Sequence, residues 1–116
     1  MQQQPIIYGI PNCDTMKKTF DWLNSKGITY TFHNYKKDGI SIATLKTWSK
    51  QVDWEILLNK KGTTFKKLDA AVQSNLNTKE KVLVWLSENT SAIKRPVVVY
   101  ESTLLVGLDA ATTFFK

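Results

Sequence analysis

Cysteine, arginine and histidine are each represented by a single residue in this chain of 116 residues, namely Cys13, Arg95 and His33. One cysteine can form neither an intrachain disulfide nor a zinc site built from several thiolates. Uninterrupted apolar runs reach only a few residues, as in 97–100, whereas a membrane-spanning helix needs about 20. A disulfide-stapled domain and a membrane-spanning protein are therefore not expected.

The amino-terminal residues 1–5 contain no basic segment and no long apolar stretch, so we expect no secretory signal. With a single unpaired cysteine, this predicts a cytoplasmic protein in a reducing compartment. Hydrophobic residues make up 42% of the chain and charged residues 22%, which is typical of a globular protein. The length is that of one domain, so we expect residues 1–116 to form a single domain that is monomeric.

The charge is strongly positive, because 16 basic residues stand against 10 acidic ones and give +6. A basic protein favours anionic partners such as phosphate, oxyanions or thiolate-bearing peptides. All basic residues except Arg95 are lysines, and they occur as scattered pairs at 17–18, 36–37, 60–61 and 66–67. Most lysines are simply solvated, and no nucleic-acid-binding motif is present, so nucleic acid is not an expected partner.

Four strands are predicted from short apolar or alternating segments, at 6–10, 29–35, 97–100 and 104–106. A helix is expected between the first two strands, because apolar residues recur at 16, 20 and 23 before Gly27. Asp109 is expected to cap a last helix that ends at Phe115. Between the second and third strands, Ser41, Asp53 and Thr78 are expected to cap helices, and residues 65–72 predict one short helix.

The order of these elements predicts the topology of the sheet. Two strands joined by a helix are expected to be parallel, and two strands joined by a tight turn are expected to be antiparallel. A βαβ unit followed by a ββα unit is the layout of the thioredoxin fold. The sequence therefore predicts an α/β, thioredoxin-like fold with a mixed four-stranded sheet and a helical insertion at about residues 41–90.

Cys13 is the first candidate for chemistry, because it directly follows the first strand and begins the first helix. The unpaired N–H groups and the dipole at a helix N-terminus stabilise a thiolate and lower its pKa. The alternative is that Cys13 is an inert, buried apolar residue. Arg95 is the second candidate, since a guanidinium can stabilise a thiolate or bind a carboxylate; the alternative is a structural pair with Asp14.

Three segments carry a resemblance to a known family. Residues 8–18 (YGIPNCDTMKK), 57–68 (LLNKKGTTFKKL) and 93–98 (IKRPVV) resemble, in the same order, the active-site segment, central loop and arginine–cis-proline strand of the arsenate reductase (ArsC) family. They are most similar to its YffB-like branch. The resemblance implies a thioredoxin-like fold and a cysteine that attacks either arsenate or a disulfide-type sulfur. It also implies that Pro96 lies against Cys13.

The resemblance also implies a set of site residues. Cys13 and Arg95 are the expected catalytic residues, and Asn12, Lys17, Lys61 and Pro96 are the expected substrate-binding residues, with no metal and no bound cofactor. Glutathione-coupled arsenate reductases of the family line their oxyanion site with three arginines. Arg95 matches one of them, the second aligns with Asn59 or Lys61, and the third falls near Gly107 and is missing. Lysine does not replace the planar guanidinium fork, so this departure argues against arsenate reduction.

A thiol exchange with glutathione or a glutathionylated protein fits these residues better, with glutathione as co-substrate and a glutaredoxin as a possible partner. Met16 occupies the fourth position of the motif that begins at Cys13, where the related Spx branch usually has a second cysteine. An adduct at Cys13 would therefore have to be resolved by an external thiol. The alternative is a non-enzymatic, Spx-like regulator that binds RNA polymerase or another protein; a third is a member whose cysteine only packs.

Overall fold

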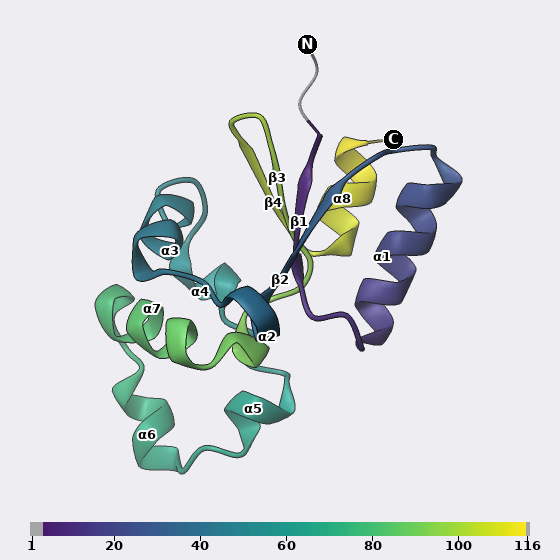
Figure 1. Ribbon diagram of the computed structural model, residues 1–116. Helices are drawn as coiled ribbons and strands as arrows, with labels where there is room; N and C mark the ends of the chain where they lie inside the picture. Colours follow the sequence, from purple (N-terminus) through teal and green to yellow (C-terminus); the bar gives the residue numbers. More distant parts are fainter. Residues whose placement is uncertain (1–3, 116) are drawn as a thin grey trace. The chain divides into compact units, whose positions relative to one another are not determined.

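A computed structural model describes residues 4–115 of the chain (Figure 1). Its elements follow in the order β1 Ile6–Gly9, α1 Asp14–Ser25, β2 Thr31–Asn34, α2 Tyr35–Asp38, α3 Ile42–Trp48, α4 Trp54–Leu57, α5 Thr63–Lys66, α6 Ala70–Asn75, α7 Lys79–Glu88, the 3₁₀ turn η1 Thr90–Ala92, β3 Val97–Tyr100, β4 Thr103–Val106 and α8 Leu108–Phe114. None of the helices described is both long and apolar enough to cross a membrane.

The chain separates into two compact units. The first contains the described residues up to Asp38 and from Arg95 onward, and the second contains Gly39–Lys94. All four strands belong to the first unit, together with α1, α2 and α8, whereas the second unit consists of helices and turns.

The sheet of the first unit has the strand order β2-β1-β3-β4. β1 pairs with β2 in parallel, and β3 pairs antiparallel with both β1 and β4. The predicted mixed four-stranded sheet is thus confirmed. In the register of β1, Tyr8 lies opposite His33 on β2 and opposite Val97 on β3, which places these three residues side by side across the sheet.

One face of the sheet is covered by α1 and α8, which lie next to each other in Figure 1. Its core contains buried residues from both helices and from the two central strands: Ile7, Met16, Leu23, Val98 and Ala111. The apolar spacing of 16, 20 and 23 explains why α1 buries this side. Successive side chains of a strand point to opposite faces, so Tyr8, which follows Ile7, points to the face opposite α1 and α8.

The second unit is built around α3 and α7, which contact each other. Their apolar side chains Leu45, Trp48, Val82, Leu83 and Leu86 are buried. The predicted caps are present in both helices, because the side chain of Ser41 accepts a hydrogen bond from the N–H of Thr44 and that of Thr78 accepts one from Lys81. Such caps satisfy N–H groups that have no partner within the helix.

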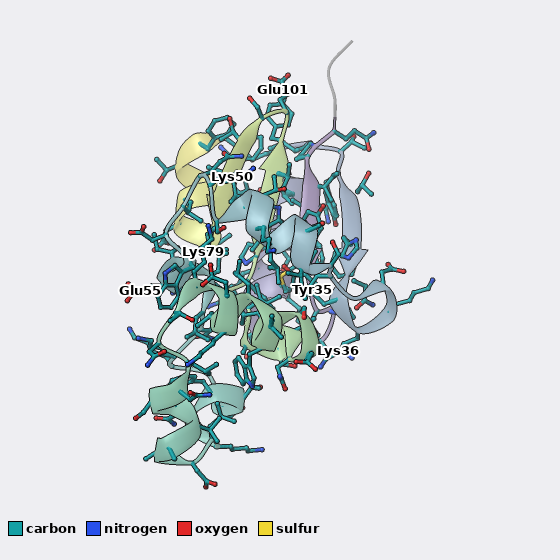
Figure 2. The ribbon with its side chains drawn as sticks, turned by 90° about the vertical axis from the view of Figure 1, so that its left-hand side faces the viewer. Tyr35, Lys36, Lys50, Glu55, Lys79 and Glu101 are labelled. Carbon is teal, nitrogen blue, oxygen red and sulfur yellow. The ribbon has the colours of Figure 1, made fainter. Side chains whose placement is uncertain are left out.

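The second strand ends one residue earlier than predicted, since Tyr35 begins α2. The N–H of Lys36 donates to the Asn34 side-chain oxygen at 2.9 Å, which turns the chain where the strand ends. Tyr35 is buried whereas Lys36 is exposed, and both are labelled in Figure 2. The alternating aromatic residues predicted a strand that continues through residue 35, so the turn at this point was not predicted.

Two further predictions on helices were wrong. Residues 65–72 form the end of α5 and the beginning of α6 rather than one helix. The Gln73 side chain donates to the carbonyls of Phe65 and Leu68, which satisfies backbone oxygens where α5 ends. Gly107, not Asp109, precedes the first residue of α8, and its φ of 95° is one that glycine adopts without strain.

Candidate functional site

Cys13 is the N-cap residue of α1, with the extended backbone (φ −136°, ψ 133°) that such a position requires. It follows β1 through the loop 10–12, and its thiol is half-buried. The carbonyl of Cys13 accepts the first hydrogen bond of the helix from the N–H of Lys17 at 2.9 Å. The thiol is thereby held at the N-terminus of a 12-residue helix and remains partly accessible.

The pKa of the Cys13 thiol results from opposed effects. Burial raises it, but the backbone N–H groups of Met16 and Thr15 and the Arg95 side chain lower it, and the net pKa lies below its ordinary value. The thiol makes no capping hydrogen bond of ordinary geometry, so we attribute the effect of the two N–H groups to their electrostatic proximity to the thiolate. The site therefore favours the nucleophilic form of the cysteine.

Arg95 and Pro96 reach Cys13 from the other end of the chain. They immediately precede β3, whose Val97 lies opposite Tyr8 near the end of β1, so they lie beside the loop that leads to Cys13. The Arg95–Pro96 peptide bond is cis and Pro96 is buried. Asp14, the alternative partner of Arg95, is exposed in the first turn of α1.

The remaining predicted residues differ in where the structure places them. Asn12 is exposed in the loop before Cys13, and the Lys17 side chain is exposed one turn beyond it. Lys61 belongs to the second unit, where it is exposed and its N–H donates to the Asn59 side chain at 3.2 Å. The first unit therefore contains Asn12, Cys13, Lys17, Arg95 and Pro96, whereas Lys61 lies outside it.

Gly107, the position at which the family's third arginine is missing, lies beside Pro96. Its N–H donates to the carbonyl of Pro96 at 2.8 Å. Its φ of 95° is unfavourable for any residue with a side chain. The backbone here thus excludes an arginine at this position without a local change of conformation.

Gly9, the last residue of β1, packs closely against Met16 of α1 just before the loop that leads to Cys13. A Cβ atom on Gly9 would lie 2.5 Å from the sulfur of Met16, which is fully buried. We expect Gly9→Ala to lower the free energy of unfolding by about 1–3 kcal/mol, because overpacking a core forces side chains and backbone to shift. Chemical denaturation checks this. In a Met16→Ala background the cost of Gly9→Ala should shrink, and an equal cost in both backgrounds would contradict the proposed clash.

Three aromatic residues next to this site were not predicted from the sequence. The rings of Tyr8, His33 and Tyr35 form a cluster, with centroids 4.7 Å apart for Tyr8 and His33, 6.2 Å for Tyr8 and Tyr35 and 6.0 Å for His33 and Tyr35. Both His33 and Tyr35 lie within the segment 29–35 that the sequence predicts as a strand. The sequence does contain an indication that Tyr35 lies near Cys13. The carboxyl ends of parallel strands meet at one edge of a sheet, and Cys13 and Tyr35 follow the two strands of the parallel pair.

The fold and the site together define a thioredoxin-like protein with a single candidate redox thiol. The model of the ArsC family matches residues 8–113, and the chain belongs to this family. The YffB protein has a similar structure, with a TM-score of 0.89 and 38% identity over 97% of this chain and 100% of that one.

Two further relatives differ in what their names state. An arsenate reductase (ArsC) related protein from Brucella melitensis is 45% identical, with a TM-score of 0.78, over 96% of this chain and 92% of its own. The regulatory protein MgsR from Bacillus subtilis is 28% identical over 113 residues, which are 94% of this chain and 86% of the relative. The predicted family is confirmed, and the names of these two similar proteins refer to an arsenate reductase in one case and to a regulator in the other.

Proposed function

We propose that this protein is a thiol oxidoreductase that removes glutathione from mixed disulfides, with Cys13 as the nucleophile. The observation that carries the proposal is the half-buried thiol at the N-terminus of α1, whose pKa is lowered by the backbone N–H groups of Met16 and Thr15 and by Arg95 although burial raises it. A lowered pKa increases the fraction of thiolate, which is the attacking species in thiol–disulfide exchange.

The reaction has two steps. The Cys13 thiolate attacks the glutathione sulfur of a glutathionylated protein; a disulfide forms between Cys13 and glutathione, and the protein thiolate leaves and takes up a proton. A glutathione thiolate then attacks the glutathione sulfur bound to Cys13, which releases glutathione disulfide and the Cys13 thiolate. The sum converts one glutathionylated protein and one glutathione into a protein thiol and glutathione disulfide. A glutaredoxin is a further candidate for the second step.

An arsenate reductase activity has less support from the residues of the site. Arg95 is the one arginine of the chain, and Gly107 has a backbone that disfavours a side chain. An oxyanion with several charged oxygens is bound best by several guanidinium groups. A mixed disulfide carries no such charge at its reacting sulfur, so a single guanidinium beside the thiol suffices for it.

Alkylation of Cys13 by iodoacetamide tests the proposal directly. We expect the rate to rise with pH around a midpoint below that of the same chain in concentrated urea, because the folded site stabilises the thiolate. S-methylglutathione, which cannot form a disulfide, should slow the alkylation of the folded protein. Equal midpoints in the folded and unfolded chain, together with no protection, would contradict the proposal.

A second candidate function is that of a regulator that binds RNA polymerase or another protein without turnover. The similarity to a regulatory protein at 28% identity favours it. Recovery of RNA polymerase from a lysate by the wild-type protein, and equally by a Cys13→Ser variant, would support this function. Turnover of a glutathionylated peptide that depends on Cys13 would support the enzyme.

A further inference from the structure

Tyr35 carries a buried hydroxyl group that the reaction above does not use. The residue is 2% exposed, and its hydroxyl oxygen is buried with no hydrogen-bond partner among the residues that the structure describes. Buried tyrosine hydroxyls usually have a partner, since an unsatisfied buried donor costs free energy. This hydroxyl is therefore a feature that needs an explanation.

The place of Tyr35 connects it to the site around Cys13. Its ring packs against Tyr8 and His33, which lie opposite each other in the register of β1 and β2. Tyr8 points to the sheet face opposite α1 and α8, and β1 continues directly into the loop before Cys13. The rings thus hold Tyr35 at the end of the parallel strand pair where Cys13 also lies.

The Arg95 guanidinium acts electrostatically on both Tyr35 and Cys13. Burial raises the pKa of Tyr35 far above its ordinary value, the Tyr8 hydroxyl raises it further, and the Arg95 guanidinium lowers it. The same guanidinium lowers the pKa of Cys13. Burial therefore keeps the Tyr35 hydroxyl protonated, so that it can donate a hydrogen bond, and it lies within the electrostatic influence of the Arg95 cation.

A neutral donor beside a guanidinium is suited to a carboxylate, whose two oxygens can accept from different groups. Glutathione carries two carboxylates at the ends of its peptide chain, away from the reacting sulfur. We propose that the Tyr35 hydroxyl is a specificity-determining donor that binds, together with Arg95, a carboxylate of the glutathionyl group attacked by Cys13. This inference rests on the proposed function. A bound carboxylate would give the buried hydroxyl the partner that the described residues do not supply.

The variant Tyr35→Phe tests the inference, with Tyr30→Phe as the matched control, because Tyr30 stacks on Phe20 of α1 rather than on the ring cluster. We expect Tyr35→Phe to be at least as thermally stable as the wild type, since it removes an unsatisfied polar atom and keeps the ring. For a glutathionylated peptide, kcat/KM should fall about tenfold. For the same peptide carrying 2-mercaptoethanol, which has no carboxylate, it should not change, and the pH profile of Cys13 alkylation should stay the same.

Two results would overturn the inference: an equal loss for both mixed disulfides, which would mean that Tyr35 supports Cys13 itself, or no loss for either. Binding of S-methylglutathione separates this test from the proposed function. If the wild type binds it without turning over the glutathionylated peptide, the proposed function fails while weaker binding by Tyr35→Phe still supports the carboxylate site. If the wild type does not bind it, the carboxylate site does not exist.

Discussion

Replacement of Cys13 by serine is expected to abolish the release of glutathione from a glutathionylated peptide, with a loss on the order of 1,000-fold or more. A serine hydroxyl is not ionised at neutral pH and does not exchange with disulfides, so no step of the reaction remains. The fold should persist, because Cys13 is an N-cap residue and serine is among the preferred residues there. Turnover is measured by release of the peptide thiol, and folding by thermal unfolding.

The pH dependence of stability provides the control for this variant. The pKa of Cys13 is lower in the folded protein than its ordinary value, so ionisation stabilises the fold. This contribution is fully present above the pKa of the unfolded chain and is lost as the pH falls through the folded pKa. The wild type should therefore gain stability relative to Cys13→Ser as the pH rises through this window. Turnover retained by the serine variant would contradict Cys13 as the nucleophile.

Loss of the Arg95 guanidinium is expected to have the second largest effect. We expect Arg95→Gln to move the alkylation profile of Cys13 to higher pH, because a cation that stabilises the thiolate is gone. The two profiles should converge at high pH, where both thiols are ionised, and differ most near neutral pH. Turnover of a glutathionylated peptide at pH 7 should fall about 10- to 100-fold, since hydrogen bonds to charged groups contribute about 1.5–3 kcal/mol.

Two further variants separate charge from geometry at this position. Arg95→Lys keeps the positive charge but not the planar fork, so the alkylation profile should stay close to that of the wild type while KM rises. Lys94→Gln removes the same charge from the neighbouring, exposed residue and should change neither quantity. If Lys94→Gln shifts the profile as far as Arg95→Gln does, the effect on Cys13 comes from net charge and not from Arg95.

Local patterns in the sequence were sufficient to predict the strands and the main helices. The segment 97–100 was predicted as a strand and is β3, and the caps at Ser41 and Thr78 form as expected. Predictions were wrong where a side chain from outside the predicted helix stabilises its end, as when Gln73 donates to the carbonyls of Phe65 and Leu68 where α5 ends. The position of the last cap was also predicted wrongly, since Asp109 was expected there and Gly107, with its positive φ, precedes α8 instead.

The candidate site could be predicted only in part for a similar reason. Cys13 and Arg95 are each the only residue of their type, which made them visible in the sequence. Tyr35 is one of four tyrosines and does not stand out in the sequence. Its candidate role depends on its burial and on the strand register that aligns Tyr8 with His33. Both properties depend on how the strands pair, and no local pattern encodes them.

Met16 has a consequence for the kinetics of the proposed reaction. Its side chain fills the space beside Gly9 at the position where a second thiol would close a ring with Cys13. The oxidised protein is then always an adduct between two molecules and never an internal disulfide. Its return to the reduced state is a bimolecular event whose rate is proportional to the concentration of free thiol. The lifetime of the adduct would thus shorten as the concentration of free thiol in its surroundings rises. With methionine in place of a second cysteine, the fraction of oxidised protein would report that concentration.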